Sequence, residues 1–230
     1  MKKKNYEILK NVEKLKRGWY TGFIPFDMYL EIKKLLHQDE YNVYYPYKDA
    51  EKIILYVDYI PKIHLYEIKS YEKLSHAMIL GSLFGLNINP EMFGDIVSFN
   101  NKFYLYLLDE INDFVIRELE YVGREKVKLI EVETDFLNNY QREYEKIKMI
   151  VPSMRIDAIT SKIALENRKG AQTLIKNGFV FVNGKVIEKY DYNVKENDIF
   201  SIRRFGKYRF KEIIGQTKKD NYIIIVEKYL

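Results

Sequence analysis

The segment from residue 155 to residue 204 is the part of the chain whose pattern allows the fewest folds. Apolar residues recur at helical spacing in two short stretches separated by a polar turn. Gly178 stands where a helix needs a left-handed residue after its last turn, and Asn183-Gly184 is a favoured two-residue hairpin turn. The segment therefore predicts two short helices, a β-hairpin and a further strand at 199–203. The apolar positions of the two helices are Ile156, Ile159, Ile163 and Ala164, then Ala171, Leu174 and Ile175.

The start of the second helix carries candidate binding residues. Asn167 is expected to cap this helix, and Arg168 and Lys169 lie in its first turn, where free backbone N–H groups favour an anion. Positive side chains there face the positive end of the helix dipole, so their presence favours a bound phosphate. Gln172 and Lys176 follow on nearly the same helical face as Arg168. The alternative is a basic helix face that is merely solvated.

Positive charge is concentrated in the same part of the chain. The net charge is +5 overall, yet residues 151–230 hold 16 Lys and Arg against 9 Asp and Glu, whereas residues 1–150 hold 22 against 24. A basic terminal domain on a slightly acidic body favours a polyanionic partner. A solvated Lys-rich surface would give the same charge balance.

The order of motifs in residues 155–204 resembles the S4 domain, an RNA-binding module of a ribosomal protein, tyrosyl-tRNA synthetases, pseudouridine synthases and heat-shock proteins. The matching features are Arg-Ile-Asp at 155–157, a polar–Arg–basic turn, Ala-x-x-Leu-Ile-x-x-Gly at 171–178 and Val-x-Val-Asn-Gly at 180–184. Asn167 replaces the usual Ser and Asn197 the usual Gly, both mild changes because Asn caps helices and tolerates positive φ. The resemblance implies RNA binding through Arg155, Asn167, Arg168, Lys169, Gln172, Lys176, Lys185, Arg203, Arg204 and Lys207.

Residues 62–132 predict a second domain with the order strand, helix, strand, strand, helix, strand. The expected elements are 63–68, 74–86, 93–99, 102–108, 109–122 and 127–132, which is the ferredoxin-like order that RNA-recognition domains also use. Tyr104 and Tyr106 share one face of the third strand and could stack on bases. Exposed or edge-of-core tyrosines are the favoured alternative, because the RNA-recognition signature is missing. Gly81 and Gly85 predict a small-residue helix face for close packing.

These patterns predict an α+β protein with three parts. Residues 1–60 form a small α/β segment, residues 61–151 the RRM-like middle domain, and residues 152–230 the S4 domain, with the boundary at Pro152 after a charged linker at 138–148. Residues 152–230 are expected to fold alone and to keep most of the RNA affinity. An exposed apolar patch on residues 1–60 would instead favour a protein-binding adaptor.

Motifs outside the S4 segment narrow the resemblance to the YlmH-type proteins of bacteria. They are Leu80–Ile96 (LGSLFGLNINPEMFGDI), Tyr121–Leu129 (YVGREKVKL) and the sequence RRFGKYRF at 203–210. This resemblance implies a ribosome-associated protein whose partners are the rRNA of the large subunit and tRNA. It implies a role in the rescue of stalled nascent chains, and the group is also linked to cell division.

The residue types present argue against catalysis. The chain has no cysteine, its three histidines show no metal-ligand spacing, and no phosphate-binding loop or dinucleotide fingerprint occurs. Asp95, after Gly94, is the one carboxylate of interest, although a structural turn residue is favoured. We expect no catalytic residue, no metal and no cofactor. The alternative is an RNA-modifying enzyme of the pseudouridine synthase type, targeted by its S4 domain.

No apolar run approaches the length that a membrane span requires, and the Lys-rich start of the chain is unlike a secretory signal. We therefore expect a cytoplasmic monomer without membrane contact.

Overall fold

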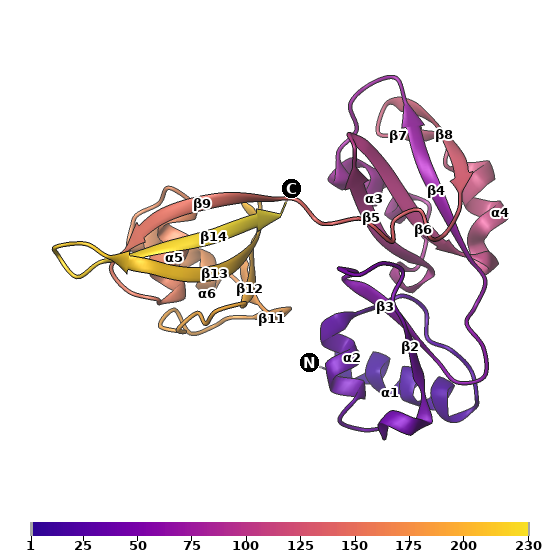
Figure 1. Cartoon of the computed structure of the whole chain (residues 1–230), viewed down its shortest axis with the longest axis horizontal. Coiled ribbons are helices and arrows are strands. Elements are labelled where there is room, and N and C mark those ends of the chain that lie inside the picture. Colours follow the sequence, from indigo (N-terminus) through magenta and orange to yellow (C-terminus); the bar gives the residue numbers. More distant parts are fainter. Residues whose placement is uncertain (1, 230) are drawn as a thin grey trace. The chain divides into compact units, whose positions relative to one another are not determined.

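The computed structural model describes residues 2–229 and divides the chain into two compact units, Met1–Gln141 and Arg142–Leu230. Each unit combines helices with antiparallel sheets, as the predicted α+β class requires (Figure 1). The division lies ten residues before the predicted boundary at 151–152. The reason is that residues 144–148 of the predicted linker belong to a strand of the second unit, Tyr144–Val151. The predicted segment 1–60 and all but the last ten residues of the predicted middle domain 61–151 fall within one unit.

The first part of the N-terminal unit packs two helices on a three-stranded sheet of order β1-β3-β2. Apolar side chains of both helices meet those of β3, including Leu15, Ile32 and Ile53. The elements are α1 (Lys2–Lys16), β1 (Ile24–Pro25), α2 (Phe26–Ile32), η1 (Gln38–Glu40), β2 (Asn42–Tyr44) and β3 (Lys52–Tyr56).

The second part of this unit is a five-stranded antiparallel sheet of order β5-β6-β4-β8-β7. Apart from the short β7, this is the strand order of a split βαββαβ unit. The helix predicted over 109–122 ends at Glu118, because Tyr121 and Val122 instead pair with β8. The elements are β4 (Ile63–Ser70), α3 (His76–Gly85), η2 (Pro90–Met92), β5 (Phe93–Phe99), β6 (Lys102–Leu108), α4 (Asp109–Glu118), β7 (Tyr121–Val122) and β8 (Glu125–Val132).

Tyr104 and Tyr106 lie in the core of the N-terminal unit. Their side chains are 2% and 0% exposed and pack in a cluster with Phe23, Tyr47 and Tyr140. The ring of Tyr47 stacks on that of Tyr106 with centroids 6.1 Å apart. Bases cannot stack on these two tyrosines, and the predicted exposed or edge position is wrong as well, because the N-terminal segment covers this face of the sheet.

Phe93-Gly94-Asp95 attaches the N-terminal segment to that sheet. A Cβ atom on Gly94 would lie 2.8 Å from Cβ of Tyr106, so only glycine fits there. Oδ2 of Asp95 accepts hydrogen bonds from the hydroxyl of Tyr47 at 2.6 Å and from the backbone N–H of Glu51 at 2.7 Å. Asp95 therefore has a structural task, on a strand rather than in a turn.

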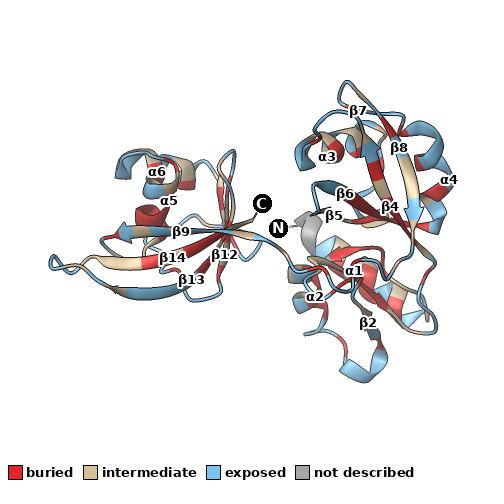
Figure 2. Cartoon of the chain, turned by 45° about the horizontal axis from the view of Figure 1, so that its top comes forward, coloured by how far each residue is buried: buried red, intermediate tan, exposed pale blue. Residues whose placement is uncertain are grey.

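The C-terminal unit packs two helices on one face of a six-stranded antiparallel sheet of order β11-β10-β12-β13-β14-β9 (Figure 2). The turn Asn183-Gly184 has positive φ at both residues, as a tight hairpin requires. Asn197 also has positive φ, at 67°, which explains how Asn replaces Gly there. The elements are β9 (Tyr144–Val151), α5 (Ile156–Ile163), α6 (Arg168–Lys176), β10 (Val180–Val182), β11 (Lys185–Val186), β12 (Ile199–Ile202), β13 (Gly206–Gln216) and β14 (Tyr222–Tyr229).

Candidate RNA-binding interface

Three of the predicted RNA-binding side chains converge on one buried carboxylate, that of Asp157 in the first turn of α5. Arg155 donates from Nε to Oδ1 and from Nη2 to Oδ2, both at 3.1 Å. Oδ2 also accepts hydrogen bonds from Nε of Arg168 at 3.0 Å and from Nε2 of Gln172 at 3.1 Å. The side chain of Asp157 is 0% exposed, whereas that of Arg168 is 53% exposed. Asp157 thus holds Arg168 in place while much of its guanidinium side chain remains at the surface.

Burial and hydrogen bonding shift the pKa of the Asp157 carboxyl in opposite directions. Burial raises its pKa, because a charged group loses solvation in the interior. The hydrogen bonds from Arg155, Arg168 and Gln172 outweigh burial, so the pKa of Asp157 lies below its usual value. The carboxylate in turn raises the pKa of Arg155 by accepting its hydrogen bonds. This group is therefore charged at neutral pH and keeps the two arginines oriented.

The start of α6 has the cap that the sequence predicts. The side-chain oxygen of Asn167 accepts a hydrogen bond of 2.9 Å from the backbone N–H of Gly170. The first turn contains no acidic residue, and its first two positions are Arg168 and Lys169. The backbone N–H groups of a first helical turn have no partner within the helix. This end of α6 thus offers backbone donors and two cationic side chains to an anion.

The predicted basic stripe of α6 divides into an anchored part and an outward part. Arg168 and Gln172 bind Asp157, whereas Lys169 and Lys176 are exposed. Lys169 and Lys176 are separated by seven residues, or about two helical turns, and therefore lie on one side of α6. These two lysines can follow a phosphate backbone without breaking a contact inside the protein.

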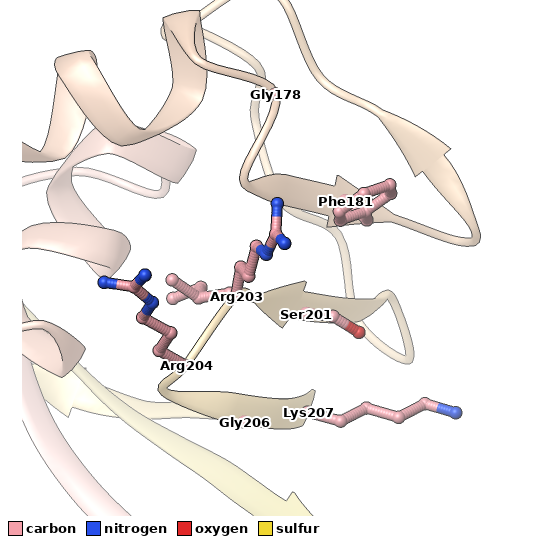
Figure 3. A pocket seen from close by; sticks show the side chains of 8 residues that line it. Gly178, Phe181, Ser201, Arg203, Arg204, Gly206 and Lys207 are labelled. Atoms are coloured by element: carbon pink, nitrogen blue, oxygen red, sulfur yellow. The ribbon is translucent and has the colours of Figure 1, made fainter. Parts of the chain in front are cut away.

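Arg203, Arg204 and Lys207 form a second basic group at the turn between β12 and β13. They line a shallow depression together with Phe181 and Ser201 (Figure 3). In Figure 3, Phe181, Ser201 and Lys207 extend to one side, whereas Arg204 extends to the opposite side. The guanidinium of Arg203 lies 5.2 Å from the ring centroid of Phe179.

Lys185, the remaining predicted residue, is exposed on β11 at the edge of the sheet and lines neither group. The predicted set therefore occupies three places on the C-terminal unit: the α5–α6 pair, the β12–β13 turn and β11.

Two acidic residues that organise this surface were not among the predicted site residues. Asp157 is one, and Asp198 is the other. Asp198 accepts hydrogen bonds from Asn183 Nδ2 and from the backbone N–H of Lys195, both at 2.8 Å, and from the Tyr192 hydroxyl at 3.2 Å. Its position fixes the hairpin turn against the start of β12. Asp157 belongs to the matched Arg-Ile-Asp motif, and Asp198 directly follows Asn197, which replaces the family's usual Gly; these positions were the available signal.

Models of known protein families match a segment in each of the two units. A family model described as "Putative RNA-binding domain in YlmH" matches residues 58–135, and the S4 domain model matches residues 154–200. The ribosome-associated protein quality control protein P2 of Bacillus subtilis is 32% identical over 193 residues, which cover 80% of this chain and 75% of the relative. The chain belongs to the YlmH family. Asp157 and all of α6 fall within the S4 match of this YlmH-family chain.

Two further similarities are narrower. The small ribosomal subunit protein uS4 of Lachnospira eligens is 32% identical over 89 residues, which cover 34% of this chain and 45% of the relative. The solved structure of the cell division protein ylmH from Streptococcus pneumoniae is 18% identical and aligns with a TM-score of 0.47, covering 57% of this chain and 90% of that chain. In the described part of the YlmH-family chain, no helix has the length and apolar character needed to cross a membrane.

Proposed function

We propose that this chain binds structured RNA without catalysing a reaction, and that it acts on the ribosome in quality control of stalled nascent chains. Its RNA partners would be the rRNA of the large subunit and tRNA, and it would act in the cytoplasm as a monomer. Similarity to the Bacillus subtilis quality control protein supports the ribosomal setting. The S4 match and the basic character of that unit support RNA as the ligand.

The observation that carries the proposal is the arrangement at the start of α6. Arg168 is fixed by a buried carboxylate, and the exposed Lys169 and Lys176 follow on the same helix. Charge-assisted hydrogen bonds from such groups suit phosphate oxygens, and their number determines the salt dependence of binding. An oriented arginine loses less conformational freedom when it binds than a freely rotating one does.

Charge reversal at the outward lysines tests the proposal most cleanly. The double variant Lys169→Glu with Lys176→Glu should lose most co-sedimentation with large ribosomal subunits and keep the wild-type melting temperature. Arg168 is unsuitable for this purpose, because a carboxylate there would repel the buried Asp157. The matched control is Lys218→Glu with Lys219→Glu, which makes the same charge change at two exposed positions in the β13–β14 turn. Equal co-sedimentation of both double variants would refute the proposed interface.

The non-catalytic part of the proposal needs a separate measurement. RNA crosslinked to the chain in cells should contain large-subunit rRNA and tRNA. Modification profiles of those RNAs should be identical in cells with and without the protein. A nucleotide that is modified only when the chain is present would instead support the RNA-modifying alternative.

A further inference from the structure

The C-terminal sheet has a second face that neither α5 nor α6, the helices described in this unit, covers. The apolar residues that meet α5 and α6 include Val182, Phe200, Tyr208 and Val226, all on the opposite face. Neighbouring residues of a strand point to opposite faces, and residues paired across strands point to the same face. The helix-free face can therefore be assigned residue by residue from the strand register.

One row of side chains crosses this face from β11 to β9. Phe181 pairs with Val186 on one side and with Ser201 on the other, and Ser201 pairs with Lys207. Nζ of Lys207 lies 4.8 Å from the ring centroid of Tyr229, which pairs with Tyr144. The row therefore contains one aliphatic, three aromatic, one hydroxyl and one cationic side chain across six strands, a distance of roughly 24 Å.

The next residues on the same face are mostly basic. Lys146 and Lys148 project from the edge strand β9, are exposed, and make no ion pair within the described residues. Glu227 is already bound to Arg209, with its Oε2 accepting hydrogen bonds of 2.8 and 2.6 Å. Glu212 lies two strands from Lys148 on this face, and the two make no ion pair among the described residues. The face thus presents an excess of positive charge.

Two arginines, Arg209 and Arg142, lie against aromatic rings of β9 and β14. The guanidinium of Arg209 lies 4.5 Å from the ring centroid of Tyr144, and that of Arg142 lies 5.2 Å from Tyr229. The ring of Phe181 is half-buried in the depression that Arg203 and Lys207 also line. A π-face beside cationic groups is the arrangement that binds successive nucleotides of a single strand.

We propose that the helix-free face of the C-terminal sheet binds a single-stranded RNA segment, with a base on Phe181 and phosphates on Lys207, Lys146 and Lys148. This inference rests on the proposed RNA-binding function and adds a second contact surface, on the opposite face of the sheet from α6. The S4 domain could then hold structured RNA and a single strand at the same time. The resulting effective concentration would strengthen both contacts.

The test uses the full chain and two labelled probes, polyuridylate and an RNA hairpin, with large ribosomal subunits as a third ligand. The variant Lys146→Glu with Lys148→Glu should bind polyuridylate roughly tenfold more weakly, and its log K against log salt slope should shrink by about 1.4, the value for two lost phosphate contacts on a single strand. Phe181→Ala should also weaken polyuridylate binding, by roughly fivefold or more, the effect of losing one stacked base. Affinity for the hairpin should change less than about twofold at 0.15 M salt, where screening extends only about 8 Å.

The controls separate this inference from the function on which it rests. Lys218→Glu with Lys219→Glu, which carries the same charge change, should bind polyuridylate as the wild type does. If Lys146→Glu with Lys148→Glu also binds it like the wild type, the sheet-face inference is overturned, whatever Phe181→Ala does. The proposed function survives that result provided that Lys169→Glu with Lys176→Glu loses large-subunit binding. Loss of subunit binding by the sheet-face variant with unchanged polyuridylate affinity would indicate a protein contact and would also overturn the inference.

Discussion

Nε of Arg168 donates a hydrogen bond of 3.0 Å to Oδ2 of Asp157, and this bond ties the first residue of α6 to the first turn of α5. The same oxygen accepts hydrogen bonds from Arg155 and Gln172. Helix pairing and presentation of the candidate RNA-binding cations therefore depend on one carboxylate. A change at Asp157 should affect stability and binding together, whereas changes at Lys169 and Lys176 should affect binding alone.

Replacing Asp157 with Asn should lower the free energy of unfolding of the C-terminal unit by about 3 kcal/mol. Removing one partner of a buried ion pair typically costs about 3–5 kcal/mol, and the partial exposure of both arginines places this case at the lower end. Urea denaturation of the wild type and the variant measures the difference. Asp220→Asn, at an exposed turn position with positive φ, is the control and should change stability by less than about 0.5 kcal/mol. Equal losses in the two variants would contradict the role of Asp157.

The lowered pKa of Asp157 makes a distinct prediction about acid stability. Burial raises this pKa, but the hydrogen bonds from Arg155, Arg168 and Gln172 lower it further than burial raises it. The stabilisation is therefore fully present above the unfolded-state value of about 3.9 and is lost as the pH falls through the lower folded-state value. Asp157→Asn should show a shallower fall in unfolding free energy below about pH 4 than the wild type does. Parallel acid profiles would show that Asp157 has no special coupling to folding.

His64 should make the N-terminal unit lose stability as the pH rises, whereas Asp157 makes the C-terminal unit lose stability as the pH falls. Burial lowers the pKa of His64, but hydrogen bonds with Asp109 at 2.7 Å and Glu131 at 2.6 Å outweigh burial and raise it, against a smaller opposing effect of Lys62. The stabilisation is full below the unfolded-state pKa of about 6.5 and is lost as the pH rises through the higher folded-state value.

Unfolding measured between pH 5 and pH 9 should therefore show a decline in the wild type that His64→Gln lacks. His37→Gln, at an exposed histidine outside this group, should keep the decline. A wild-type profile that coincides with that of His64→Gln would count against the charged state of His64 in the fold.

Two glycines of the N-terminal unit should respond to alanine in opposite ways. A Cβ on Gly22 would lie 2.3 Å from the backbone oxygen of Glu91, so Gly22→Ala should destabilise the unit by roughly 1–3 kcal/mol. At Gly81 in α3 no described atom beyond the neighbouring residues and the local helix backbone lies within 4 Å of the added Cβ, and Gly81→Ala should stabilise the helix by up to about 1 kcal/mol. The tight helix packing predicted for Gly81 and Gly85 is therefore wrong. Thermal unfolding of both variants measures the two shifts, and shifts of the same sign would contradict the packing described here.

The sequence was sufficient to predict strands and helix caps whose bounds depend on residues close by in the chain. The strands at 93–99 and 102–108 occur at the predicted bounds, and Asn167 caps α6, because turn and cap chemistry lies within a few residues of each element. The burial of Tyr104 and Tyr106 depends instead on Phe23, Tyr47 and Tyr140, which are distant in sequence. A strand's own pattern shows that one face is apolar or aromatic, but it does not show what covers that face.

For the candidate site, too, the sequence predicted which residues take part but not how they contact one another. The S4 motifs located the cationic residues, but the convergence of Arg155, Arg168 and Gln172 on Asp157 requires the packing of α5 on α6. The predicted linker at 138–148 is wrong for residues 144–148, which belong to β9. Charged residues of β9 alternate with Ile147, Met149 and Val151, which face the core. This period-2 pattern is the sequence signal for a strand.

The position of β9 changes which fragment should fold alone. All eight residues of β9 pair with β14, and the side chain of Val151 is 0% exposed in the core of the C-terminal unit. A fragment of residues 152–230 would leave β14 as an open edge and expose part of the apolar surface around Ile224 and Val226. Burying a single aliphatic side chain such as Val151 contributes about 1.5–3 kcal/mol, so the loss of the strand would remove much of a small domain's stability.

Residues 142–230 should therefore unfold cooperatively and bind the RNA hairpin, whereas residues 152–230 should be unfolded or aggregate at the same temperature. Circular dichroism melts of the two fragments, with hairpin binding at one salt concentration, provide the comparison. Lys218→Glu with Lys219→Glu in the longer fragment controls for charge, since these exposed turn positions should leave the melt unchanged. A cooperative melt of residues 152–230 at the temperature of the longer fragment would show that β9 is dispensable, and the core of the S4 unit would then be complete without it.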